Sequence, residues 1–343
     1  MADITIRGAG IFGLSIAWVC VERGARVTII DPNGPAAGSS GGVVGALAPH
    51  VPENWNAKKA FQLDSLLSAE RFWADVEAAG GTSAGYTRSG RQQPIADEKA
   101  LNLARQREIN AADLWRGQAE WRVQRAEATP WCPKSPTGWI IHDTLSAHLH
   151  PRQGCMALVA ALIAKGARIE EDGEDTGAVI WATGTAGLQE LGTRTHRSVG
   201  NGVKGQAAVL NIDARGAPQI FADSVHIVPH GDGTVAVGST SEREFEDPGS
   251  TDHQLDAVVA RARAAVPALQ DAKVIARWAG VRPRARSRAP MLGPYPDRPG
   301  HFIANGGFKI GFGMAPKIAQ VMADLVLDGH DTIPEGFEVE ASF

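Results

Sequence analysis

The sequence predicts an α/β fold in which a parallel sheet with flanking helices is interleaved with an antiparallel sheet. The parallel sheet is indicated by apolar runs at 4–7 and 26–30, which are separated by a glycine turn and an apolar helix. The antiparallel sheet is indicated by residues 203–238, where β-forming residues cluster around turn signals such as Gly231-Asp232-Gly233. Two interleaved lobes also suit a chain of 343 residues, which exceeds one average domain.

Each further element is expected from apolar periodicity and from the residues that end helices. Gly24 is expected at the end of the first helix, and Pro267 at the end of a later one. The expected helices are 14–22, 57–79, 97–103, 153–165, 252–266 and 315–327. The expected strands are 4–7, 26–30, 167–171, 177–182, 203–210, 225–229, 234–238 and 274–278.

The turn after the first strand carries three glycines at the spacing of a dinucleotide-binding turn. In Gly8-Ala9-Gly10-Ile11-Phe12-Gly13 they permit a tight turn, close approach of a pyrophosphate and close helix packing. The following helix N-terminus offers free N–H groups to phosphates. Asp31 ends the second strand, where a carboxylate can accept hydrogen bonds from ribose hydroxyls. This context predicts a Rossmann-like fold that binds NAD or FAD, and it disfavours NADP, whose 2′-phosphate Asp31 would repel.

The order of the elements predicts a discontinuous division of the chain. Strand–helix alternation occupies 1–80, returns at 140–200 and closes at 280–343, so these segments are assigned to the nucleotide-binding domain. Residues 81–139 and 201–279 lack that alternation and are assigned to a substrate-binding domain.

Composition argues against several classes of protein. With 43% hydrophobic and 21% charged residues and a formal net charge of -4, nothing indicates a nucleic-acid partner. Cys20, Cys132 and Cys155 show neither CxxC spacing nor histidines at metal-ligand intervals, so we expect reduced thiols and no metal site. No apolar run approaches the roughly 20 residues of a membrane span, and the N-terminus enters a strand at once. We therefore expect a cytoplasmic protein.

Four separated segments resemble the D-amino-acid oxidase superfamily, and within it the glycine oxidase and sarcosine oxidase branch. They are the turn through Asp31, the loop Ser39-Ser40-Gly41-Gly42-Val43-Val44-Gly45-Ala46-Leu47-Ala48-Pro49, the run 228–240 and a carboxyl-terminal segment. The last contains Trp278-Ala279-Gly280-Val281-Arg282-Pro283, Pro290-Met291-Leu292-Gly293 and Gly306-Gly307-Phe308-Lys309-Ile310-Gly311-Phe312-Gly313. The likeness covers nearly the whole chain. It implies a glutathione-reductase-type FAD-binding domain, an antiparallel-sheet substrate domain, and FAD as the cofactor.

The resemblance also implies a reaction and the residues that carry it. Such enzymes oxidise a small amine or amino acid by hydride transfer from its α-carbon to flavin N5, and water hydrolyses the resulting imine. Arg282 matches the arginine that pairs with the substrate carboxylate, and Lys309 matches a basic residue that assists it. A guanidinium offers a bidentate fork, whereas an ammonium adds a point charge. The residues expected to contact FAD are Gly8, Gly10, Ile11, Phe12, Gly13, Asp31, Ser39, Ser40, Gly42, Val43, Thr183, Gly184, Gly306, Gly307, Phe308, Lys309, Ile310 and Gly311.

His226 is the third candidate catalytic residue. It lies where relatives often present an aromatic hydroxyl, and an imidazole there could hydrogen-bond the substrate and titrate near neutrality. His50, just after the cofactor loop, is a weaker candidate. Each candidate has a structural alternative: Arg282 as a surface ion-pair partner, Lys309 as a chain that extends to solvent, and His226 as a satisfied core histidine.

Three departures from the family pattern carry expectations of their own. No cysteine lies near Arg282, so FAD is expected to bind noncovalently. Residues 170–179 connect two strands of the nucleotide-binding fold through a short polar segment, where relatives usually insert an antiparallel meander. This predicts a smaller binding site around the adenine end of FAD. Arginines continue after Arg282 at alternating positions, at 284, 286 and 288. They are interpreted either as a positive rim that selects a doubly anionic substrate or as a solvated strand face.

Two further functions remain open from the sequence. The opening turn alone would allow an NAD-dependent dehydrogenase. The short crossing would allow a noncatalytic flavoprotein or a subunit of a heteromeric dehydrogenase. For the leading hypothesis, the partners are a small amine or amino-acid substrate and either oxygen or an electron carrier. The oligomeric state is not predicted.

Overall fold

The glycine turn joins the first strand to the first helix in the computed structural model, which describes residues 3–343. β1 (Asp3–Arg7) ends at this turn, and α1 (Ile11–Glu22) begins within it, three residues earlier than expected. Gly24 follows the helix with a φ of 85°, as a C-terminal glycine should. β2 (Arg26–Ile30) then pairs in parallel with β1.

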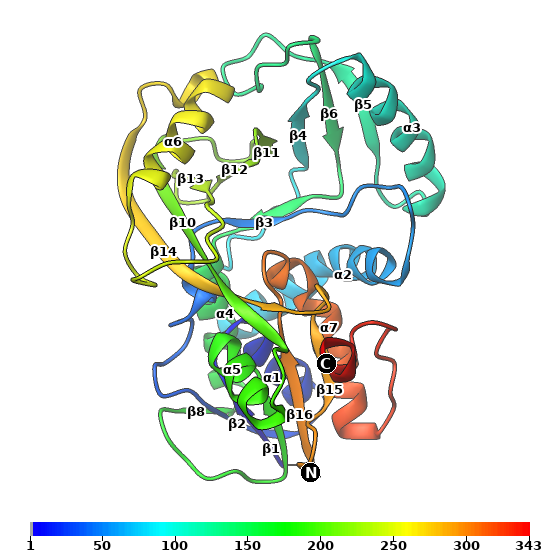
Figure 1. The fold of residues 1–343 in the computed structure, drawn as a ribbon, viewed down its shortest axis with the longest axis vertical. Coiled ribbons are helices and arrows are strands. Elements are labelled where there is room, and N and C mark those ends of the chain that lie inside the picture. The colour runs from blue at the N-terminus through cyan, green and yellow to red at the C-terminus, as the bar shows by residue number, and fades with distance from the viewer. Residues whose placement is uncertain (1–2) are drawn as a thin grey trace.

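A six-stranded sheet forms the lower part of the molecule in Figure 1, with the strand order β15-β16-β9-β1-β2-β8. Its strands are parallel except for β15, which runs antiparallel to β16 at the edge. The four strands not yet described are β8 (Arg168–Glu170), β9 (Ala178–Trp181), β15 (Met291–Pro294) and β16 (His301–Asn305). The carboxyl ends of β1 and β9 therefore lie side by side, where a nucleotide binds in such sheets.

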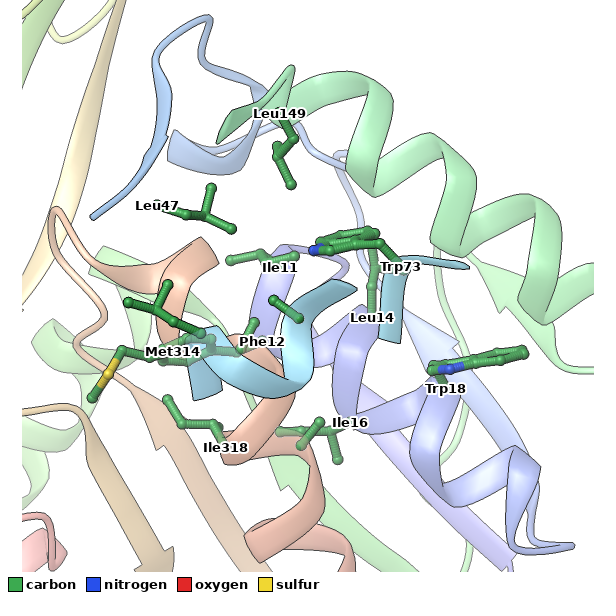
Figure 2. Packing of buried hydrophobic residues seen from close by; sticks show 14 of the residues in the cluster. Ile11, Phe12, Leu14, Ile16, Trp18, Leu47, Trp73, Leu149, Met314 and Ile318 are labelled. Atoms are coloured by element: carbon green, nitrogen blue, oxygen red, sulfur yellow. The ribbon is translucent and has the colours of Figure 1, made fainter. Parts of the chain in front are cut away.

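The helices beside this sheet pack around α1. Figure 2 shows side chains of α1, such as Ile11 and Ile16, beside Met314 and Ile318 of α7, with Trp73 of α2 near them. Nearly every side chain of α1 through Cys20 is buried, so the helix is apolar all round. The helices of this region are α2 (Ala57–Gly80), α4 (Pro151–Ala164), α5 (Gly184–Thr195) and α7 (Gly311–Asp328).

An eight-stranded sheet forms the upper part, with the order β14-β10-β13-β12-β11-β4-β6-β5 (Figure 1). All of its pairs are antiparallel except β11 with β4. α6 (His253–Ala265) covers one face, where Leu255 and Val258 pack on Ala208 and Val237. Its strands are β4 (Arg91–Pro94), β5 (Trp121–Arg125), β6 (Trp139–Asp143), β10 (Gly200–Asn211), β11 (Gln219–Ala222), β12 (Val225–Pro229), β13 (Val235–Gly238) and β14 (Lys273–Ala285).

Several elements are longer than their sequence patterns indicate. α3 (Glu98–Leu114) continues beyond the expected 97–103 because its buried positions, among them Leu101 and Ala104, recur at helical spacing on a polar helix. β14 extends beyond the expected 274–278 because β10 pairs with it over its whole length. The carboxyl end of β14 includes Arg282.

The exact domain boundaries stay a prediction. β6 belongs to the antiparallel sheet, although the sequence assigns 140–200 to the nucleotide-binding domain. β14 likewise crosses the expected boundary between 201–279 and 280–343.

In the part of the chain that the structure describes, no helix is both long enough and apolar enough to span a membrane.

His230 holds the loop that follows β2, and His150 and His148 lie nearby. This loop includes a short 3-10 helix, η1 (Ser39–Gly41), and β3 (Gly45–Leu47), which pairs with β7 (Ala147–Leu149). His230 Nε2 lies 3.0 Å from Val43 O, and its Nδ1 lies 3.1 Å from the Thr234 hydroxyl. The rings of His230 and His150 are 4.7 Å apart, and His148 lies on β7. Burial is the main cause that lowers the pKa of His148 and of His230 to about 4.

These buried histidines predict a loss of stability in acid. The unfolded pKa is about 6.5, so below pH 6.5 the unfolded chain binds protons that the folded protein excludes until about pH 4. Stability should therefore fall as the pH falls through this window. In His230→Gln, which keeps a polar side chain but cannot titrate, the slope should decrease by up to about 1.4 kcal/mol per pH unit.

Urea unfolding at pH 7, 6 and 5 measures that slope. His330→Gln is the matched control for the substitution itself, since His330 is exposed. Equal slopes for native protein and His230→Gln would contradict the proposed cause.

Candidate active site

Close packing of backbone on backbone fixes the turn between β1 and α1. A Cβ at Gly13 would overlap the carbonyl oxygen of Gly8, and a Cβ at Gly8 would overlap the carbonyl oxygen of Ala182. Gly8 also has a φ of 109°, which disfavours any side chain. A Cβ at Gly10 would lie 3.1 Å from Ser40 Oγ, so this glycine faces the loop after β2. These contacts form a cradle at the N-terminus of α1, as a bound pyrophosphate requires.

Asp31 and Ser40 hold this turn from either side. Asp31 Oδ2 accepts a hydrogen bond of 2.8 Å from Ala9 N, and Ser40 Oγ accepts one of 3.0 Å from Ile11 N. A carboxylate keeps further lone pairs after such a bond. Contact between Asp31 and a ribose stays a prediction, but the structure adds a role that the sequence pattern missed, because the carboxylate also anchors the glycine turn.

A second turn lies where β9 meets α5. Thr183 precedes α5, and Gly184 has a φ of 59°. The hydroxyls of Thr183 and Thr185 are buried, and neither finds a hydrogen-bond partner among residues 3–343. Asn305 Nδ2 donates to Gly184 O over 2.8 Å and fixes this turn to β16. Buried hydroxyls seldom lack partners, so they fit a polar ligand such as FAD at the edge of the sheet.

The short crossing on the adenine side packs back onto β1. No strand forms in residues 171–177. Arg7 Nε lies 2.7 Å from Asp175 Oδ1, and an Arg7 guanidinium nitrogen donates to Gly173 O. Thr5 Oγ1 accepts a hydrogen bond of 2.8 Å from Thr176 N. Polar contacts to the first strand therefore hold the crossing that replaces the meander.

The carboxyl-terminal glycine turn lies against the first helix. A Cβ at Gly307 would come within 2.7 Å of Phe12 Cζ. Gly306 and Phe308 both have positive φ, at 76° and 43°. Phe308 N donates a hydrogen bond of 2.9 Å to Pro283 O, which joins the turn to β14. α7 then begins at Gly311 with no side-chain cap, so its first N–H groups face the same region.

Several candidate site residues lie on one face of the eight-stranded sheet, the face opposite to the one that α6 covers. Trp278, Ala207, Gly238 and His226 form one row across four strands. Gly280 and Arg282 follow Trp278 at alternating positions of β14, so they share its face. The Trp278 ring lies over Gly280, whose Cβ would be 2.5 Å from its Cζ2.

The loop after β2 touches this face through the same ring. A Cβ at Gly42 would lie 3.3 Å from Trp278 Cη2. The sequence pattern missed this role of Trp278, although the alternation of Trp278, Gly280 and Arg282 was a usable signal. Val43 lies next to this contact, and its carbonyl oxygen is held by His230.

Arg282 forms no ion pair within residues 3–343, and Glu242, whose charge acts on it, is paired with Lys204. The Arg282 guanidinium lies over Gly205, where a Cβ would overlap Nη1. Nη1 is buried, finds no hydrogen-bond partner, and forms no ion pair in the described part of the chain. Burial lowers the pKa of Arg282 to about 10, and the charge of Glu242 opposes this shift. The side chain is therefore charged at neutral pH, and it lies on the site face of the sheet.

His226 and Lys309 lie near this guanidinium. The His226 ring packs 4.6 Å from the Phe221 ring, and its Nδ1 is buried without a partner among residues 3–343. Burial, and then the positive charges of Arg91, Lys309 and Arg282, lower its pKa to about 3. This opposes the expectation that His226 titrates near neutrality, because burial and these three positive charges disfavour a protonated imidazole here.

Lys309 combines an exposed surface with a perturbed charge. Local desolvation, and then the charges of Arg282 and Arg284, lower its pKa although the residue as a whole is exposed. His50 does not join this group of cations, because its ring and its backbone N–H both contact Gln62 Oε1. This contact favours a structural role for His50.

The cysteines are buried, and Cys155 Sγ lies 3.9 Å from Ser40 O in the loop after β2. Cys20, Cys132 and Cys155 are all free thiols. Burial raises the pKa of Cys20 and of Cys155 to about 12, so both are protonated. Within residues 3–343, no group of three or more His, Cys, Asp or Glu side chains could hold a metal ion.

Several known proteins are similar to this chain in sequence. The family model described as DAO, FAD dependent oxidoreductase, matches residues 3–325. Glycine oxidase from Pseudomonas aeruginosa is 32% identical over 132 residues, which make up 38% of this chain and 36% of that relative. Glycine oxidase from Geobacillus kaustophilus is 25% identical over 372 residues, covering 94% of this chain and 92% of the relative.

Solved structures show the same fold. Iminodiacetate oxidase from Chelativorans sp. BNC1 has a TM-score of 0.84 and 23% identity, with 98% of each chain covered. Glycine oxidase from Geobacillus kaustophilus has a TM-score of 0.83 and 20% identity, with 99% of each chain covered. These structures confirm the predicted α/β fold class. The family match spans most of the sequence, and the chain therefore belongs to the DAO family of FAD-dependent oxidoreductases.

Proposed function

We propose that this enzyme oxidises a small amino acid or amine whose carboxylate is bound by Arg282. The observation that carries this proposal is the buried Nη1 of Arg282, which has no partner in the described chain. An unsatisfied buried donor costs about 1–3 kcal/mol, and more when it is charged. A substrate carboxylate would remove this cost and accept two parallel hydrogen bonds from the guanidinium.

Lys309 and His226 have distinct roles in this proposal. Lys309 adds positive charge to the same region, as its coupling with Arg282 indicates. His226 is neutral at physiological pH, since its pKa is about 3. A neutral imidazole can accept a hydrogen bond through one ring nitrogen and donate through the other. It can therefore orient a substrate amine without adding a further positive charge.

The cofactor turns supply the remaining requirements of an oxidation. FAD, when bound, supplies the ring that accepts the electrons, by hydride transfer from the substrate α-carbon. Gly8, Gly10 and Gly13 give its pyrophosphate a close approach to the backbone, and the N-terminus of α1 provides N–H donors. The uncapped N-terminus of α7 offers a partial positive charge to a developing negative charge.

The relatives support a small substrate that contains both an amine and a carboxylate. Their names specify glycine oxidase and iminodiacetate oxidase. A noncatalytic flavoprotein is the second candidate, because the short crossing at 171–177 departs from the family pattern. An NAD-dependent dehydrogenase is disfavoured by the family match.

Anaerobic mixing of the flavin-loaded enzyme with single amino acids tests the proposal. Glycine, sarcosine, proline and D-amino acids form a suitable panel. Loss of the flavin absorbance with any of them demonstrates catalysis. A flavin that none of them reduces, although dithionite reduces it, would favour the noncatalytic alternative.

Arg282→Ala should raise KM for carboxylate substrates by at least about 30-fold, because truncating one partner of a buried charge pair costs at least about 2 kcal/mol. Steady-state kinetics with the best substrate of the panel measures the change. Arg286→Ala is the matched control, since Arg286 is exposed and donates to Phe343 O at the far end of the chain. An unchanged KM in Arg282→Ala would remove this residue from the site.

Gly205→Ala should act through Arg282, because the added Cβ would occupy the position of Nη1. We expect KM to rise about 10-fold or more, since each lost charged hydrogen bond costs about 1.5–3 kcal/mol. The flavin spectrum and kcat should change much less. In the Arg282→Ala background, Gly205→Ala should add almost nothing, as a double-mutant cycle can measure.

Additive effects of the two substitutions would contradict this link between Gly205 and Arg282. A merely structural role for Gly205 predicts that additivity, because loss of packing would not depend on the residue at position 282.

A further inference from the structure

A cluster of positive side chains extends from Arg282 toward the N-terminus of α2. We call Lys58, Arg284, Arg288 and Lys309 the cationic rim. The Arg284 guanidinium lies 5.1 Å from the centroid of the Phe308 ring, and the Lys309 ammonium lies 5.6 Å from the same centroid. Lys58 Nζ donates a hydrogen bond to Arg288 O. Arg284 and Lys309 therefore meet around one aromatic side chain, and Lys58 contacts the turn that carries Arg288.

The backbone joins the rim to the site. Arg284 follows Arg282 by two residues, so both side chains start from the same face of β14. A β-bridge pairs Arg284 with Gly307, directly before Phe308. Lys58 lies in the first turn of α2. The rim is thus built from three separate segments that the fold brings together.

The rim has no acidic partners. Among residues 3–343, none of its four members takes part in an ion pair, whereas other arginines such as Arg107 and Arg298 do. Partial burial, and then Arg284 and Arg288, lower the pKa of Lys58. For Lys309 the causes are likewise burial and neighbouring cations. A field of one sign that no protein group neutralises attracts and concentrates anions.

A solvated strand face explains this arrangement poorly. Arg284 and Lys58 are half-buried, and Arg284 lies over the Phe308 ring instead of extending into water, whereas Arg288 and Lys309 are exposed. Arg286 offers the contrast within the same segment, because its guanidinium bonds to Phe343 O. The four rim cations repel each other, so their convergence suits a ligand that brings negative charge.

We propose that the cationic rim is a second anion-binding subsite beside Arg282, and that the preferred substrates are amino acids that carry two carboxylates. This inference rests on the proposed function. One carboxylate pairs with Arg282, and the other is bound by Arg284 with support from Lys309 and Lys58. Arg284 is suited to this role because its planar fork can bind a carboxylate bidentately.

Matched pairs of substrates test the second subsite. D-aspartate is compared with D-asparagine, and iminodiacetate with sarcosine, so that each pair differs mainly in the second carboxylate. In anaerobic mixing we expect at least one dicarboxylate to reduce the flavin with a kcat/KM about 10- to 100-fold above that of its partner, as one charged hydrogen-bonded contact provides. The pair that shows the difference reports whether the second carboxylate lies on the side chain or on the amine.

Arg284→Gln should lower this ratio by about 10-fold or more, because it removes the charge and the bidentate fork but keeps a side chain long enough to cover Phe308. Arg286→Gln removes an equal charge from the same segment and should leave the ratio unchanged. The ratio separates a lost subsite from a general loss of activity, since a general loss would affect both substrates of a pair.

A binding measurement provides a readout without turnover. Succinate and butyrate are titrated into the oxidised enzyme, and the perturbed flavin absorbance reports their dissociation constants. We expect succinate to bind about 10-fold or more tightly, and we expect this preference to decrease with salt and in Arg284→Gln.

Three results would overturn the subsite. They are equal kcat/KM within both substrate pairs, equal ratios in Arg284→Gln and Arg286→Gln, or a loss of FAD affinity in Arg284→Gln without a change of ratio, which would assign the rim to the cofactor. The failure of the proposed function is distinguishable, because in that case no amino acid reduces the flavin. If monocarboxylates alone reduce it, the proposed function stands and only the subsite is wrong.

Discussion

The structure depends on the close approach of backbones where β1, β9 and α1 meet. Gly13 packs on the carbonyl of Gly8, and Gly8 packs on the carbonyl of Ala182, without room for a Cβ at either position. A side chain there would push α1 away from the sheet. Because α1 is buried between the sheet and the other helices, such a shift would disturb the largest core cluster of the molecule.

The same packing connects the two ends of the chain. Phe12, inside the glycine motif, contacts Gly307 in the carboxyl-terminal turn, and Phe308 N is bonded to Pro283 O. The strand that carries Arg282 is therefore tied by a backbone hydrogen bond to a turn that rests on the first helix. This linkage sets the distance between Arg282 and the cofactor cradle, which the proposed oxidation would require.

The sequence predicted local units well and non-local ones poorly. The unit from β1 to β2 is contiguous, so its apolar runs and glycine spacing were sufficient. β14 was predicted too short, since its length is set by pairing with β10 and not by its own composition. Arg282 and Lys309 were predicted as site residues only through resemblance to a family, and their roles stay a prediction.

Other features of the candidate site had no local signal at all. Gly205 is an unremarkable glycine until the register places it under the Arg282 guanidinium. The hydroxyl of Thr185 is notable only because it is buried without a partner. Arg284 was one of three alternating arginines, and only its contact with Phe308 separates it from exposed Arg286.

Unpaired buried cations reduce the stability of a protein unless a ligand is present. The guanidinium of Arg282 and the ammonium of Lys309 repel each other, and burial adds a desolvation cost for Arg282, whose Nη1 is buried, while Lys309 is exposed as a whole. A charge that served only the fold would be expected to have a carboxylate beside it, as Arg91 has Asp143 within the same sheet, at 2.9 Å. A ligand that binds only the folded protein raises its free energy of unfolding, and tighter binding raises it more. Under the proposed function, a substrate carboxylate would supply the partner that Arg282 lacks among residues 3–343.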